Sequence, residues 1–191
     1  MKLHRNSQKR IYCDDAVYFV TCKTSDNYPF FREQVFCDLF VENLRICKEL
    51  KGFKLFAWIL NLDHFHLLIQ PNDEFNISEI MRSLKTNSSC DINRTTSPEG
   101  AVPAPRLREI YRNKLNIFDY QTQFLQTHPN QNPFPKFHWQ KSYHDHIIRN
   151  DDDFEYHFEY IKFNPEKHHL PKKWPYIFTN PEYENLNDLI Y

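Results

Sequence analysis

Residues 54–71 read KLFAWILNLDHFHLLIQP, and this stretch decides the fold. Residues 54–62 are apolar almost throughout and predict a buried strand. Asp63 interrupts the apolar run, and 64–71 predicts a second strand directly after it. Because so short a break separates the two strands, they are expected to pair as an antiparallel hairpin.

Further elements are expected on both sides of this hairpin. The β-branched and aromatic residues of 16–24 predict a strand, and helical spacing over 30–50 predicts a helix that closes at Gly52. Later in the chain we expect helices over 76–93, 106–126 and 154–163 and a strand within 137–149. Asp151, Asp152 and Asp153 are expected to cap the last of these helices. This order predicts an α+β fold, a ferredoxin-like split βαβ antiparallel sheet with helices on one face.

The length of 191 residues suits a single domain. We expect one domain over residues 1–191, with a long insertion at about 95–136, where prolines and polar residues gather, and a C-terminal extension at about 171–191.

Composition excludes several classes of protein. The five cysteines are odd in number, scattered and never spaced as CxxC, which argues against a disulfide scaffold or a cysteine-based zinc site and favours a reducing, cytoplasmic compartment. No apolar run approaches the ~20 residues of a membrane span, and no apolar segment follows the basic start as in a secretory signal. The net charge of −1 means that any nucleic-acid contact must come from local basic patches.

The first candidate site is His64-Phe65-His66. Residues i and i+2 of a strand share a face, so the two imidazoles project together while Phe65 turns to the other side. Two adjacent imidazoles suit a divalent cation. A bare His-x-His pair also arises by chance in a histidine-rich chain, and His144 with His146 forms a second one.

The second candidate site is the segment 160–165, YIKFNP. Tyr160 and Asn164 are four residues apart, hence on one face of a helix. Asn offers a carbonyl oxygen to a cation, and Tyr is an uncommon but real nucleophile. The simpler alternative makes Tyr160 a core residue and Asn164 a helix C-cap, and Tyr156 is a rival tyrosine one turn earlier.

With these residues in place, the chain resembles the IS200-like transposases, single-tyrosine nucleases of the HUH type, and more narrowly the REP-associated tyrosine transposases. Three stretches carry the resemblance: the histidine pair within LDHFHLLIQP, the helix ISEIMRSLK at 77–85, and the C-terminal series Trp139-Gln140, Tyr143 to Arg149, Tyr160-Ile161 and Asn164-Pro165. It covers roughly residues 10–178, and the ordered set is more specific than any one motif.

The resemblance implies a metal-dependent DNA endonuclease and strand transferase. His64, His66 and Asn164 would hold Mg²⁺ or Mn²⁺, where the insertion-sequence branch typically has glutamine in place of Asn164, and Tyr160 would form a 5′-phosphotyrosine. The implied partner is single-stranded DNA with an imperfect hairpin, REP-like or from an insertion-sequence end, bound by a monomer or a homodimer. Arg5, Arg10, Arg82 and Lys85 are candidate phosphate contacts, Tyr143 could stack on an unpaired base, and Gln140, His144 and His146 have weaker claims to the site.

Two other functions are compatible with these residues. One is a domesticated, non-catalytic protein that binds DNA hairpins. The other is an unrelated ferredoxin-like domain in which His64 and His66 hold a structural zinc ion, which would require a closed four-ligand site.

Overall fold

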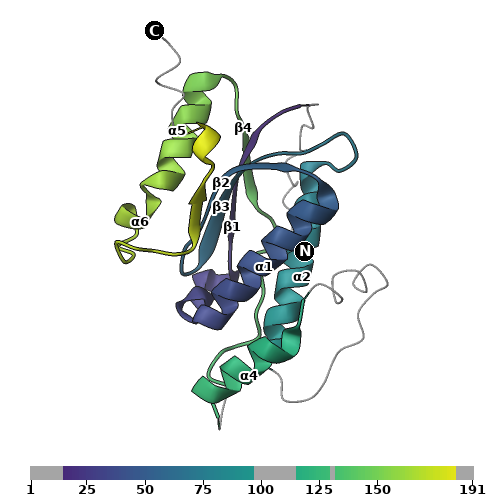
Figure 1. The fold of residues 1–191 in the computed structure, drawn as a ribbon, viewed down its shortest axis with the longest axis vertical. Coiled ribbons are helices and arrows are strands. Elements are labelled where there is room, and N and C mark those ends of the chain that lie inside the picture. The colour runs from purple at the N-terminus through teal and green to yellow at the C-terminus, as the bar shows by residue number, and fades with distance from the viewer. Residues whose placement is uncertain (1–14, 97–114, 130–131, 184–191) are drawn as a thin grey trace, which may run out of the picture.

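The computed structural model describes residues 15–96, 115–129 and 132–183. Its helices and strands, in chain order, are β1 (Tyr18–Lys23), α1 (Gln34–Lys51), β2 (Lys54–Leu60), β3 (His64–Gln70), α2 (Ile77–Thr96), α4 (Ile117–Thr127), β4 (His144–Ile147), α5 (Asp151–Lys162), α6 (Asn164–Lys167) and β5 (Ile177–Thr179), as Figure 1 shows. Short 3₁₀ turns cover Ser25–Asn27, Phe30–Arg32 and Pro181–Tyr183.

The strands form one five-stranded sheet in the order β4-β1-β3-β2-β5, in which neighbouring strands run antiparallel. The hairpin expected at 54–71 is the centre of this sheet, since β3 pairs with β2 on one side and β1 on the other. The α+β fold class predicted from the sequence is confirmed. The edge strand β5 was not expected, because its three residues follow a segment of tryptophan and proline turns.

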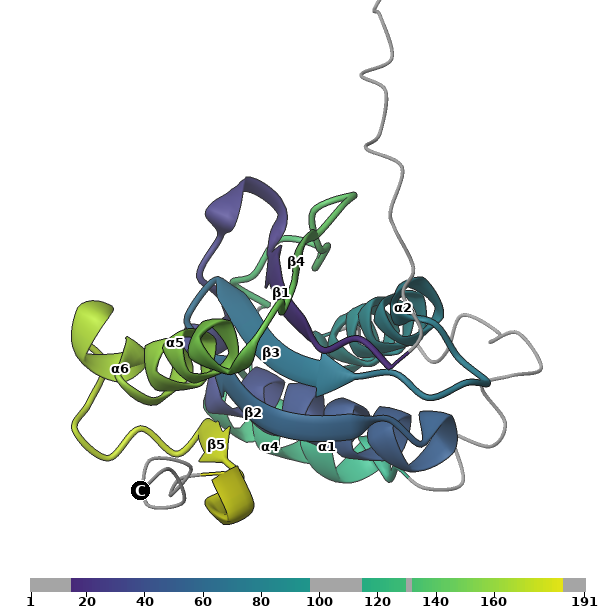
Figure 2. The same cartoon turned by 90° about the horizontal axis from the view of Figure 1, so that it is seen from above.

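Helices cover both faces of the sheet, which corrects the expectation that they lie on one face. Side chains of α1, α2 and α4 share a core with Phe65, Leu67 and Ile69 of β3. On the opposite face, Phe158 and Ile161 of α5 pack in a second cluster with Leu68, and Figure 2 shows α5 and α1 on either side of the sheet. The alternation of β3 therefore places His64 and His66 on the α5 side.

Two helix ends follow from local chemistry. Helix α1 ends at Gly52, whose φ of 61° is left-handed, as expected. Helix α5 is capped by Asn150, whose side chain accepts a hydrogen bond from the backbone N–H of Asp153, so the cap lies one residue before the predicted acidic run.

Helix α5 ends at Lys162, close to the predicted end at residue 163. Asn164 and Pro165 then open the short helix α6, where a proline in the first turn loses no hydrogen bond, so Tyr160 and Asn164 lie on two helices and not on one as predicted.

The predicted insertion is only partly described. Helix α2 extends through Thr96, and residues 97–114 and 130–131 lie outside the described ranges, as does most of the first half of the helix predicted over 106–126. Its second half is α4, where Phe124 stacks on Phe36 of α1. Within the described ranges, none of the helices has the length and apolar character needed to cross a membrane.

Candidate active site

The two histidines of β3 are almost fully buried beneath α5, with His64 6% and His66 4% exposed. Their ring centroids lie 4.9 Å apart, close enough for both to reach one small ligand. Phe65 between them is 0% exposed and packs in the core on the opposite face, as the alternation predicted.

A hydrogen bond orients each ring through its Nδ1 atom. His66 Nδ1 lies 2.8 Å from Thr21 Oγ1 on the neighbouring strand, and His64 Nδ1 lies 2.6 Å from the Asp63 carboxylate. The Nε2 atoms are therefore the ones that remain for a ligand, with tautomers assigned from these partners. His66 Nε2 is buried and finds no hydrogen-bond partner among the described residues.

Asn61 and Asn164 complete a small polar centre beside the histidines. The Asn61 side-chain NH₂ donates to His64 Nε2 at 3.0 Å and to Asn164 Oδ1 at 2.8 Å. Asn164 is 1% exposed, and its own Nδ2 has no partner within the described part of the chain. An unpaired buried polar atom is costly, and three occur on these side chains among the described residues, Asn61 Oδ1, His66 Nε2 and Asn164 Nδ2, which indicates a ligand.

These residues fit a divalent cation. The Asn61 side-chain NH₂ donates to the lone pairs of His64 Nε2 and Asn164 Oδ1, and a bound cation could accept both lone pairs instead. Two imidazole nitrogens and one amide oxygen form a mixed donor set that leaves coordination positions open. The His168 ring also lies 4.9 Å from the His64 ring, but in the described ranges no third histidine, cysteine or carboxylate brings a ligand atom close enough to those of His64 and His66 to form a compact group, which does not favour closed structural zinc.

Burial keeps the two imidazoles neutral. Burial, with a smaller contribution from the neighbouring His64, lowers the pKa of His66 to about 2. Burial also lowers the pKa of His64, although the hydrogen bond and charge of Asp63 oppose the shift. Because a histidine must be neutral to bind a metal, both rings are ready to do so without losing a proton.

Tyr160 is the tyrosine that reaches this centre. Its ring lies 5.3 Å from the His66 ring and meets it edge-on at 85°. The Lys167 ammonium donates a hydrogen bond to Tyr160 Oη at 3.4 Å and lies 4.5 Å from the ring centroid. Tyr156, the rival, is 66% exposed, and its described ring contact is with His157.

The fold thus brings together His64, His66, Tyr160 and Asn164, which the sequence singled out from two segments about 100 residues apart. Asn61 and Lys167 were missed. Asn61 stands in the hairpin turn, where asparagine is common for conformational reasons alone, and Lys167 follows a proline that seemed to end the helix.

The residues predicted to contact DNA do not gather at one place as the four site residues do. Arg5 and Arg10 lie outside the described residues, and Arg82 is exposed on α2, on the other side of the sheet. Lys85 donates to the backbone carbonyls of Gln140 and Lys141 at 2.7 and 3.3 Å. Tyr143 is half-buried, with its hydroxyl 3.2 Å from Ser78 Oγ.

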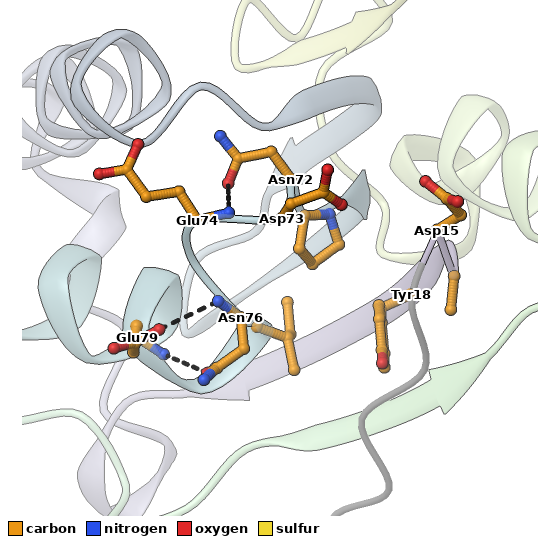
Figure 3. A pocket seen from close by; sticks show the side chains of 10 residues that line it. Asp15, Tyr18, Asn72, Asp73, Glu74, Asn76 and Glu79 are labelled. Carbon is orange, nitrogen blue, oxygen red and sulfur yellow. Dashed lines mark hydrogen bonds between the residues drawn. The ribbon is translucent and has the colours of Figure 1, made fainter.

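A separate pocket of about 150 Å³ lies at the other end of β3, between the start of β1 and the start of α2 (Figure 3). Four carboxylates line it, those of Asp15, Asp73, Glu74 and Glu79. This concentration of negative charge is unsuited to a phosphate, so the pocket is no candidate for a nucleic-acid site.

Comparisons with known proteins show which family the chain resembles. Residues 17–101 match the family model "Transposase IS200 like". A curated protein of Haemophilus influenzae described as a "Putative REP-associated tyrosine transposase" is 24% identical over 175 residues, which are 90% of this chain and 84% of that protein.

The fold is similar to a solved structure of a REP-associated tyrosine transposase bound to a REP hairpin. The TM-score is 0.58 at 19% identity, and the match covers 91% of this chain and 82% of the other. The resemblance to the IS200-like transposases, with REP-associated tyrosine transposases among the relatives, is therefore confirmed.

Proposed function

We propose that this protein is a metal-dependent, single-tyrosine DNA endonuclease and strand transferase that acts on hairpin-bearing single-stranded DNA. One observation carries the proposal: Tyr160 lies beside a buried, neutral histidine pair in which His66 Nε2 has no partner among the described residues. The likeness to a protein solved with a REP hairpin supports this class of substrate.

His64, His66 and Asn164 are the proposed ligands of Mg²⁺ or Mn²⁺. A cation held there would neutralise charge on the non-bridging oxygens of a phosphodiester. The chain adds positive charge of its own. Burial is the main cause of the lowered pKa of His64, and the hydrogen bond and charge of Asp63 oppose it, but Lys23 and Lys167 lie near enough to lower this pKa as well. The developing charge of the reaction would thus meet a positive environment.

Tyr160 is the proposed nucleophile. Its Oη attacks phosphorus, the bond between phosphorus and the 3′ oxygen breaks, and the phenolic proton ends on that oxygen. The products are a 5′-phosphotyrosine and a free 3′-OH, and the reverse reaction with another 3′-OH transfers the strand. Lys167 already donates to Tyr160 Oη, so its ammonium stabilises negative charge that grows on this atom during attack.

The matched pair Tyr160→Phe and Tyr156→Phe tests the proposal. Protein, Mn²⁺ or Mg²⁺, and labelled single-stranded hairpins from the DNA flanking its own gene are combined and separated on a denaturing gel. We expect a cation-dependent protein–DNA band with wild type and Tyr156→Phe and none with Tyr160→Phe, which should still retard the hairpin on a native gel.

A covalent band that survives Tyr160→Phe would reject this nucleophile. Retardation on the native gel without any covalent band in the wild type would instead favour the non-catalytic hairpin-binding protein.

A further inference from the structure

A second group of metal-ligating side chains lies beside the first but does not share its residues. His146 of β4 and Asp153 and His157 of α5 each offer one ligand atom, and these atoms all lie within 4.8 Å of one another. His146 Nε2 is 2.8 Å from Asp153 Oδ2, and His157 Nδ1 is 3.1 Å from Asp153 Oδ1. The two imidazole rings stack with centroids 4.7 Å apart.

The protein holds the carboxylate of this group in place from behind. Asp153 Oδ2 accepts a hydrogen bond from the backbone N–H of Arg149 at 3.0 Å, while the Asp153 N–H donates to the capping side chain of Asn150 at 2.9 Å. Outer contacts of this kind orient metal ligands in known sites. The side chains of Asp153 and His157 are 19% and 14% exposed, and that of His146 is 36% exposed, so one side of the group is open to solvent.

The spacing suits a small borderline cation. Tetrahedral bonds of about 2.0–2.1 Å to zinc place ligand atoms roughly 3.3 Å apart. Asp153 Oδ1 nearly matches this spacing, since it lies 3.0 Å from His146 Nε2 and 3.1 Å from His157 Nδ1. Hydrogen bonding alone satisfies the group less well, because two stacked imidazoles share one carboxylate and repel each other if both are protonated. Binding would exchange the hydrogen bond between His157 Nδ1 and the Asp153 carbonyl, at 2.8 Å, for a metal bond.

We propose that His146, Asp153 and His157 form a second divalent-cation site, of the open zinc type with two imidazoles and one carboxylate. Its ligands come from two elements, so a bound cation ties the edge strand β4 to α5. Tyr160 lies three residues beyond His157 on α5, and the Phe19 ring contacts both His157, at 4.5 Å, and His66, at 5.2 Å. The site would therefore fix the helix that carries Tyr160, although its existence does not depend on the proposed function.

Zinc alone is the probe that tests this site. The full chain is freed of metal, and Zn²⁺ binding is measured by titration calorimetry in wild type, His157→Gln, His146→Gln and the double variant His64→Gln/His66→Gln. We expect both single variants to weaken one equivalent of Zn²⁺ by at least about 100-fold, more than loss of an outer-shell contact costs. The double variant should keep this equivalent.

The matched control is His144→Gln, because His144 is an exposed histidine two residues from His146 on the same strand and outside the group. It should bind Zn²⁺ as the wild type does. Melting curves in a chelator check that every variant folds, and Zn²⁺ should raise the melting temperature of the double variant but raise it less in His157→Gln.

Unchanged Zn²⁺ binding by both His146→Gln and His157→Gln would overturn the proposal. So would loss of all Zn²⁺ binding in the double variant, since the histidines of β3 would then account for every bound ion. Failure of the wild type to form a covalent DNA complex would reject the proposed function and leave this result unaffected.

Discussion

Lowering the pH should lower the free energy of unfolding, because the buried His66 ring takes up a proton only when the protein unfolds. In the folded state burial lowers the pKa of His66 from 6.5 to about 2, so the ring stays neutral over the working range of pH. In the unfolded state the same ring titrates near 6.5. The unfolded state therefore takes up a proton first, and stability falls as pH drops below about 6.5.

The size of the loss follows from the unfolded state alone, provided that the folded pKa lies below about 4. Proton uptake between about pH 7.5 and about pH 5 then lowers the free energy of unfolding by about 2 kcal/mol. This is a large fraction of the 5–15 kcal/mol typical of a domain. His66→Gln keeps a polar side chain beside Thr21 but has no proton to gain.

The assay is urea unfolding at the two pH values in the presence of a chelator, because bound metal would add its own pH dependence. Wild type should lose about 2 kcal/mol more than His66→Gln over this interval. Equal losses in the two proteins would refute the reasoning, because they would show that His66 is free to take up a proton in the folded state.

Three further changes test other contacts. Lys167→Gln should slow formation of the covalent DNA complex about five- to eightfold at low salt, since one charge at 3.4 Å from Tyr160 Oη is worth about 1 kcal/mol in a water-like environment. Thr21→Val should weaken Mn²⁺ binding about tenfold in calorimetry, because its hydroxyl orients His66 through Nδ1. Gly52→Ala should lower the free energy of unfolding by about 1 kcal/mol or more, because φ is 61° and an added Cβ would lie 2.9 Å from a neighbouring amide nitrogen.

Each of these changes has a control. Lys162→Gln removes an exposed lysine at the end of α5, the helix before α6, and should leave the rate unchanged, so equal slowing by both variants would remove Lys167 from the site. Thr122→Val removes a hydroxyl on α4, far from the histidines in sequence, and should not alter Mn²⁺ binding. A Gly52→Asn variant tolerates left-handed φ better, so it should lose less stability than Gly52→Ala if conformation dominates.

The central part of the fold was predictable because its signals are local. Alternation around Phe65 placed the histidines on one face, and Gly52 ended α1 where its left-handed conformation is required. The face covered by α5 was not predictable, because periodicity shows that a helix has an apolar side but not which side of a sheet receives it. Strand β5 was too short to leave a pattern, and only its pairing with β2 defines it.

The candidate site divides in the same way. His64 and His66 share a strand, so this pair followed from spacing. Tyr160 lies on α5 and Asn164 opens α6, so the single helical face expected for them is not what the structure shows. The approach of the two pairs to one another is a property of the sheet and of α5, and it required the resemblance to a family or the structure.

The group of His146, Asp153 and His157 spans two elements, and nothing in its spacing connects a histidine of one with a carboxylate of the other.

The most direct test of the central claim is to identify the amino acid that becomes joined to DNA. The covalent complex formed with Mn²⁺ is digested with nuclease and protease, and the peptide that carries the nucleotide remnant is sequenced by mass spectrometry. The proposed mechanism predicts one modified residue, Tyr160, linked through a 5′-phosphate. A remnant on Tyr156, or on any residue distant from His64 and His66, would contradict it.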